Sequence, residues 1–186
     1  MGRFSTTVLI KANGDFLTAF GEMMKKRGFE PCSESDAALS FFVALSGGWA
    51  TLAEKSYNND PKQARDDALN ISKELKTSAF MVEIVDSDFA ILELNGDEVI
   101  VGDGSGYGIE DAPRGSKNVW EPMLANGTFE ELVKIWETNE VFVEDALCKS
   151  APLLGIDPKY IVVDYRDLSE NADSDKNITA LFFKKI

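Results

Sequence analysis

Carboxylates are the side chains of this chain that could take part in catalysis or bind a metal ion. The 186 residues include 32 acidic residues, 19 basic residues and no histidine. The absence of histidine excludes Ser-His and Cys-His nucleophile pairs, imidazole acid–base catalysis and His-ligated metals. Carboxylates can still act as general acids or bases, or as ligands of hard cations such as Ca²⁺ and Mg²⁺.

The acidic residues gather in one stretch of the sequence. Between Lys76 and Arg114 there is no basic residue, and nine acids lie there: Glu83, Asp86, Asp88, Glu93, Asp97, Glu98, Asp103, Glu110 and Asp111. Asp86-Ser87-Asp88 falls at a predicted turn, and Asp103 follows a returning strand, so these three carboxylates could meet at one sheet edge. The calcium-loop pattern is absent. Three interpretations stay open: turn formation by Asp and Ser, an acidic patch facing a protein partner, and a metal or acid–base site.

A glycine-rich loop follows the acidic strands. Gly102, Gly104, Gly106 and Gly108 alternate along it, so the loop matches neither a dinucleotide-binding fingerprint nor a Walker A loop. It contains no lysine or arginine that could hold a phosphate. It is either a flexible connection or a mobile binding loop with Tyr107 as its aromatic contact.

Tryptophan and cysteine are weaker candidates for a binding or reactive site. Trp49 follows Gly47-Gly48 and is expected either in the core or at the rim of a cleft. Cys32 and Cys148 lie far apart, which fits neither a disulfide framework nor a zinc site. We predict no catalytic residue, no metal ligand and no cofactor. The candidate binding residues are Asp86, Asp88, Asp103, Tyr107, Glu110, Asp111 and Trp49.

Net charge restricts the class of partner. The formal net charge is −13, whereas a nucleic-acid-binding protein needs a basic surface to neutralise phosphates. Anionic membranes are disfavoured for the same reason. No apolar run approaches the length of a membrane span, and the N-terminal residues lack a secretory signal. We therefore expect a cytoplasmic protein, a monomer or a homodimer pairing a sheet edge, with a basic protein as its partner.

The first half of the chain predicts an antiparallel sheet with two helices. Strands are expected at residues 3–11, 38–45, 49–52 and 79–85, with a hairpin turn at Gly47-Gly48. Asn13 is expected to cap a helix over 14–27, and Asp60-Pro61 to open a second helix ending near Lys76. This β-α-β-β-α-β order is that of the ferredoxin-like motif. A hairpin over 89–94 and 98–102, turning at Asn95-Gly96, extends the sheet.

The second half predicts helices and a last strand. Residues 102–118 are expected to be a loop. Thr128 and Glu131 form a capping box before one helix, and Asn139 is expected to cap a second helix ending at Gly155. Residues 160–165 fit helix or strand, and 178–184 a strand. The predicted class is α+β: residues 1–112 form the sheet with two helices, and 119–186 a helical extension with a terminal strand, packed on the first part as one domain.

Several short motifs resemble a loose group of uncharacterised bacterial α+β proteins. They are Gly48-Trp49, the Asp60-led helix, Asp86-Ser87-Asp88, the Asp103–Tyr107 loop, and the segments 141–147 and 153–158. Some members of such groups look like toxin-immunity or other protein-interaction modules. The resemblance covers residues 38–168 and implies a bacterial cytosolic context and an interaction function, with no catalytic residues.

Two functional hypotheses follow. The first is a non-enzymatic interaction module, such as an immunity protein or inhibitor, that presents an acidic face to a basic partner. Complementary charge of this kind raises association rate and specificity. The alternative is a carboxylate-based enzyme that binds a metal or small ligand through Asp86, Asp88 and Asp103.

Overall fold

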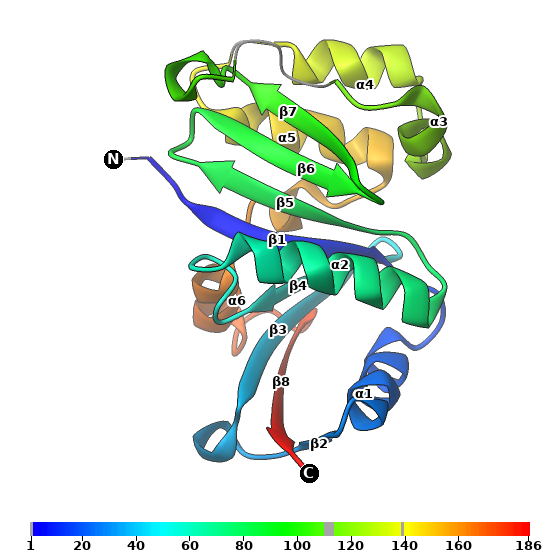
Figure 1. Cartoon of the computed structure of the whole chain (residues 1–186), viewed down its shortest axis with the longest axis vertical. Coiled ribbons are helices and arrows are strands. Elements are labelled where there is room, and N and C mark those ends of the chain that lie inside the picture. Colours follow the sequence, from blue (N-terminus) through cyan, green and yellow to red (C-terminus); the bar gives the residue numbers. More distant parts are fainter. Residues whose placement is uncertain (1, 110–113, 139) are drawn as a thin grey trace.

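The computed structural model describes residues 2–109, 114–138 and 140–186 and confirms the α+β class. Within these residues, eight strands form one sheet in the order β2-β8-β3-β4-β1-β5-β6-β7, and every neighbouring pair is antiparallel. Figure 1 shows the strands stacked from β7 at the top to β2 at the bottom. Their bounds are β1 Ser5–Lys11, β2 Phe29–Pro31, β3 Leu39–Ser46, β4 Trp49–Glu54, β5 Ala79–Val85, β6 Phe89–Leu94, β7 Asp97–Gly102 and β8 Ile178–Lys185.

Three tight turns set the register of the hairpins. Gly47-Gly48 joins β3 to β4 and Asn95-Gly96 joins β6 to β7, whereas three residues, Asp86-Ser87-Asp88, join β5 to β6. Gly47-Gly48, Asn95-Gly96 and the first two residues of the β5–β6 turn all have positive φ, from 51° at Asp86 to 82° at Gly48 and Gly96. Two-residue turns with this backbone match the right-handed twist of the strands that they join. The turns predicted at these three places are confirmed.

Helices α1 (Phe16–Lys26) and α2 (Pro61–Leu75) cover one face of the sheet. Helix α2 begins as predicted, since the Asp60 side chain accepts from the Gln63 N–H at 3.2 Å. The prediction that Asn13 caps α1 is wrong. Gly14 has a left-handed φ of 68°, which no helix can include, so the helix begins two residues later and Asp15 caps it.

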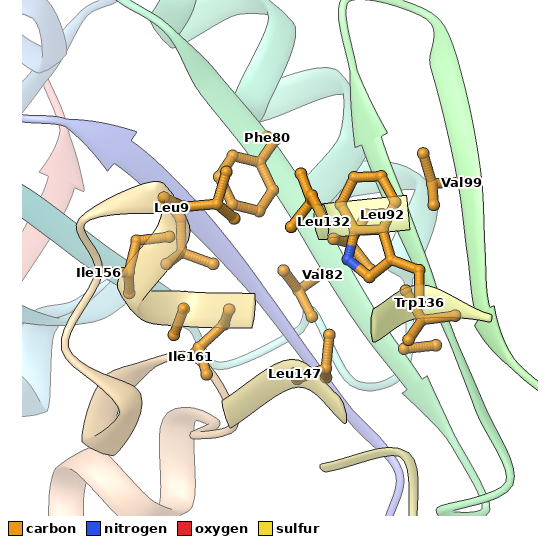
Figure 2. Close-up of a cluster of buried hydrophobic side chains, with 14 of the residues drawn as sticks. Leu9, Phe80, Val82, Leu92, Val99, Leu132, Trp136, Leu147, Ile156 and Ile161 are labelled. Atoms are coloured by element: carbon orange, nitrogen blue, oxygen red, sulfur yellow. The ribbon is translucent and has the colours of Figure 1, made fainter. Parts of the chain in front are cut away.

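Strand β1 is buried on both sides. Val8, Leu9 and Ile10 are all fully buried, and because side chains alternate along a strand they point to opposite faces. Val8 and Ile10 pack beneath α1 and α2. Leu9 packs on the other face, in a cluster with Phe80 and residues of the C-terminal helices, as Figure 2 shows. Helices on both faces thus make three layers (Figure 1).

The C-terminal part covers the second face and also completes the sheet. Its helices are α3 (Lys117–Trp120), α4 (Phe129–Trp136), α5 (Val143–Leu154) and α6 (Tyr165–Asn171). The capping box at Thr128 and Glu131 is confirmed. Strand β8 lies between β2 and β3, and neither that position nor β2 itself was predicted.

Three details of this part differ from the expectations. Helix α3 begins inside the 102–118 segment that was predicted as a loop. Residue 139, the expected cap of a second helix, lies outside the described residues; the residue that precedes α5 is Phe142. Of the ambiguous segment, Tyr160 ends a 3₁₀ turn, 161–164 are neither helix nor strand, and α6 begins at Tyr165. No helix among the described residues has the length and apolar character needed to cross a bilayer.

Candidate functional site

Ser87, at the turn between β5 and β6, holds three segments together. Its side chain accepts from the Arg3 backbone N–H at 2.7 Å and donates to the Glu144 carboxylate at 2.7 Å. Its backbone N–H donates to the Arg3 carbonyl at 3.1 Å, and its carbonyl accepts from the Val143 N–H at 3.0 Å. The N-terminal segment and the start of α5 are therefore both attached to this turn.

The N-terminal segment lies directly against the turn. The Gly2 N–H donates to the Asp86 carboxylate at 2.7 Å. A Cβ at position 2 would lie 1.9 Å from the Asp86 carbonyl oxygen, closer than any side chain permits, so a glycine is required for this approach. Figure 1 shows the N-terminus beside the ends of β5 and β6.

Tyr107 brings the glycine-rich loop to the same turn. The loop forms one 3₁₀ turn, Ser105–Tyr107, and the Tyr107 ring packs on Phe89 with 5.1 Å between centroids. The Tyr107 hydroxyl lies 3.4 Å from a carboxylate oxygen of Asp86 and 3.4 Å from one of Asp88. Good O–H···O bonds are about 2.5–3.0 Å long, so the hydroxyl saturates neither carboxylate. Desolvation, together with these two negative charges, raises the pKa of Tyr107.

An open pocket of about 330 Å³ lies beside this contact. Asp88, Asp103, Tyr107, Glu140 and Val141 are among the residues that line it. Asp103 accepts from the Ser105 N–H at 2.9 Å, and hydrogen bonds from the Ser105 hydroxyl and N–H lower the pKa of Asp103. The structure therefore brings Asp103 to the same pocket as Asp88, while Asp86 and Asp88 converge on Tyr107.

We call this surface the acidic edge: Asp86, Asp88, Asp103, Tyr107, Glu140, Val141 and Phe142. Glu140 pairs with Lys149. No lysine or arginine of the described residues forms an ion pair with the three aspartates. Large apolar side chains stand exposed beside them, with exposed fractions of 83% for Val141, 57% for Phe142 and 48% for Tyr107. Unpaired negative charge beside exposed apolar surface is typical of a contact surface rather than of a solvated face.

The other acids of the base-free stretch lie elsewhere. Glu93 and Glu98 pair with Arg65 of α2, and the Arg65 Nη2 atom lies 3.4 Å from Glu98. Burial raises the pKa of Glu83 and of Glu93, and the nearby Arg65 opposes that rise. The nine acids thus do not form one continuous face. Side chains alternate between the two faces of the sheet along β5, β6 and β7, and this alternation turns Glu83, Glu93 and Glu98 toward α2.

Asp97 has a structural role beside α3. Its carboxylate accepts from the Ser116 N–H at 2.8 Å and from the Trp120 indole N–H at 2.7 Å. Although partial burial alone would raise it, the pKa of Asp97 is lowered by hydrogen bonds from Ser116 and Trp120. Asp97 therefore attaches α3 to β7 and is not part of the acidic edge.

The remaining candidates fall outside the acidic edge. Glu110 and Asp111 lie outside the described residues. Trp49 is 4% exposed, its indole N–H donates to the Leu154 carbonyl at 3.1 Å, and its ring packs edge-on against Phe80. The structure places Trp49 in the core.

Sequence reasoning missed Ser87, Glu140, Val141 and Phe142. The sequence predicts Ser87 only as a turn former, whereas its two side-chain partners lie 57 and 84 residues away. The exposed pair Val141-Phe142 precedes a helix, and large apolar side chains of this kind are more often buried than exposed. Only the three-dimensional arrangement identifies these residues.

Among the described residues, no group of three or more Asp, Glu, Cys or His side chains has the arrangement of a metal site. No protein-family model, no curated protein and no solved structure matches the chain.

Proposed function

We propose that this chain is a non-enzymatic protein-interaction module that binds a basic partner through the acidic edge. The observation that carries the proposal is the convergence of Asp86 and Asp88 on an exposed Tyr107 hydroxyl at 3.4 Å, without a cation among the described residues to neutralise them. An arginine of the partner can donate to two carboxylate oxygens at once, with shorter bonds than the tyrosine makes.

The composition of the acidic edge supports a protein partner. Tyrosine is enriched among the residues that dominate binding energy at interfaces. Tyr107, Val141 and Phe142 supply apolar contact area, and Asp86, Asp88 and Asp103 supply charge that steers a basic partner. An immunity protein or inhibitor of a cationic toxin or nuclease is the concrete form of this proposal, in a bacterial cytosol. The free thiols of Cys32 and Cys148 support a reducing compartment.

The proposal extends to fold and assembly. Strands β3, β4, β1 and β5 are neighbours in that order, and α1 and α2 pack on one face, which supports a ferredoxin-like core extended by the β6–β7 hairpin. We propose a monomer or homodimer that binds neither nucleic acid nor membranes, on the ground of its net charge of −13.

A pull-down from the native host tests the interaction. The baits are the unmodified chain, an Asp88→Asn/Asp103→Asn variant, and a Glu22→Gln/Asp173→Asn variant that removes the same charge from exposed positions elsewhere. We expect a basic protein to be retained at low salt, released at high salt, and lost from the first variant only. Equal retention by both variants, or no salt-sensitive protein at all, would refute the proposal.

The alternative function is a metal- or ligand-dependent enzyme built on Asp86, Asp88 and Asp103. The shared pocket of Asp88 and Asp103 favours it. A thermal-shift series with Ca²⁺, Mg²⁺ and Mn²⁺ tests the metal version, because a cation that binds only the folded state must raise Tm. An unchanged Tm with all three would remove the metal version of this alternative.

A further inference from the structure

A second pocket, separate from the acidic edge, lies between α1, α2 and β3. Its volume is about 170 Å³. For comparison, an apolar cavity of about 150 Å³ can hold a benzene molecule. Phe20, Phe29 and Phe41 contribute aromatic walls, and Arg27, Gln63 and Asp67 contribute polar groups. A mostly apolar pocket with a few convergent polar groups is the usual form of a small-ligand site.

Asp67 is the polar group that the surrounding protein leaves incomplete. One of its oxygens accepts from the hydroxyl of Tyr57, a fully buried residue, at 2.9 Å. The other, Oδ1, lies 3.8 Å from Arg27 Nη1, too far for a hydrogen bond. No other donor among the described residues reaches Oδ1. The carboxylate thus presents one acceptor oxygen to the pocket.

Arg27 forms an ion pair with Asp67 at 3.8 Å, but its hydrogen bonds go to another acid. Its Nε and Nη2 atoms donate to Glu74 at 2.9 Å and 2.7 Å. Glu54, a buried carboxylate that accepts from the Ser56 N–H at 2.6 Å, adds a further negative charge that Asp67 feels. Four acids, Asp67, Glu74, Glu54 and Asp66, therefore lie near one arginine, and the surroundings of the pocket are net negative.

Burial raises the pKa of Asp67, against the opposing effects of Tyr57 and Arg27. A carboxylate in these surroundings lacks part of the stabilisation that water would give its charged form. Perturbed acids in pockets are associated with binding and catalytic sites. A cation placed at Oδ1 would supply the missing donor and offset the net negative charge.

We propose that the α1–α2 pocket binds a small organic cation, a primary amine on a benzene-sized apolar group, with the ammonium donating to Asp67 Oδ1 and the ring packed among Phe20, Phe29 and Phe41. The aromatic faces also attract cations directly. This site is independent of the acidic edge, because none of its residues belongs to that surface.

Benzylamine is the probe, and benzyl alcohol is its neutral counterpart of the same size. A ¹H–¹⁵N NMR titration of the full chain follows both. We expect benzylamine to bind with millimolar affinity and to change the chemical shifts only of the amides of 20–29, 39–41 and 63–71. Benzyl alcohol should bind about tenfold more weakly, because it lacks the charged hydrogen-bond donor.

Two variants locate the charge. Asp67→Asn should weaken benzylamine binding about tenfold, whereas Asp173→Asn, the same charge change at an exposed residue that does not line the pocket, should change it less than twofold. Equal effects of the two variants, equal affinity for amine and alcohol, or shifts centred on Tyr107 would each overturn the proposal. The comparison of amine with alcohol needs no variant, so it decides the matter even if Asp67→Asn does not fold.

Discussion

Ser87 is the residue whose replacement most directly tests how the acidic edge is assembled. Ser87→Ala removes a hydroxyl that bonds Arg3 and Glu144, each at 2.7 Å, at a position that is 6% exposed. Alanine has no polar atom there, so a backbone N–H and a carboxylate lose their partner together. Ser87→Gly removes the same hydroxyl and also the Cβ.

The expected magnitudes follow from these contacts. A hydrogen bond to a charged group contributes about 1.5–3 kcal/mol and a neutral one about 1 kcal/mol, so Ser87→Ala should lower the free energy of unfolding by roughly 2–4 kcal/mol. Ser87 has a φ of 61°. Alanine keeps the steric strain of this left-handed backbone and glycine does not, so Ser87→Gly should be more stable than Ser87→Ala by about 1 kcal/mol.

Urea unfolding of the two variants and of the unmodified chain measures both differences. Ser35→Ala, at an exposed serine far from the turn in sequence, is the control and should change stability by less than about 0.5 kcal/mol. Hydrogen exchange adds a local measurement, because the Val143 N–H donates to Ser87 and should lose protection in Ser87→Ala. A Ser87→Ala variant as stable as the control, or a glycine variant less stable than the alanine one, would refute this description of the turn.

Three further outcomes are expected. Burial raises the folded-state pKa of Asp67 above its unfolded value. The folded state therefore binds this proton more tightly than the unfolded state, and the contribution of Asp67 to stability falls as pH rises. The unfolding free energy of the unmodified chain minus that of Asp67→Asn should fall between about pH 4 and pH 7, and a rise would contradict the reasoning. Arg65→Gln should lower the free energy of unfolding by about 1 kcal/mol at pH 7, discounted for the 42% exposure of the side chain. The loss should be smaller at lower pH, because burial raises the pKa of its partner Glu93. Lys73→Gln is the control, and a loss that grows as the pH falls would count against the pairing. Burial, followed by the charges of Asp145 and Glu144, raises the pKa of Cys148. In a Cys32→Ser variant, the Cys148 thiol should therefore react with a disulfide reagent at pH 8 more slowly than free cysteine does. An equal or faster rate would refute this.

Local signals predicted the elements that depend on neighbouring residues. The turns at Gly47-Gly48, Asp86-Ser87 and Asn95-Gly96 were predicted, since positive φ favours these residue types. The start of α2 was predicted from Asp60-Pro61. The start of α1 was placed two residues early because Asn13 and Asp15 are both good caps, and the left-handed Gly14 decides between them.

Arrangements between distant segments could not be predicted in this way. Strand β8 was recognised as a strand, but its place between β2 and β3 depends on contacts over more than 130 residues. The sequence places nine acids in one base-free stretch, but it does not show that Arg65 comes from α2 to pair with two of its glutamates. The acidic edge likewise needs Glu140 and Val141, which no spacing in the sequence connects with Asp88.

Photo-crosslinking from the acidic edge in the native host would identify what this surface contacts. A benzophenone amino acid replaces Tyr107 in one variant and Leu69, another exposed apolar residue, in the control. We expect a basic protein to be crosslinked from position 107 and not from position 69, and the adduct to disappear when Asp88→Asn is added. Equal crosslinking from both positions, or no protein adduct from position 107, would contradict the claim that this edge is the binding surface.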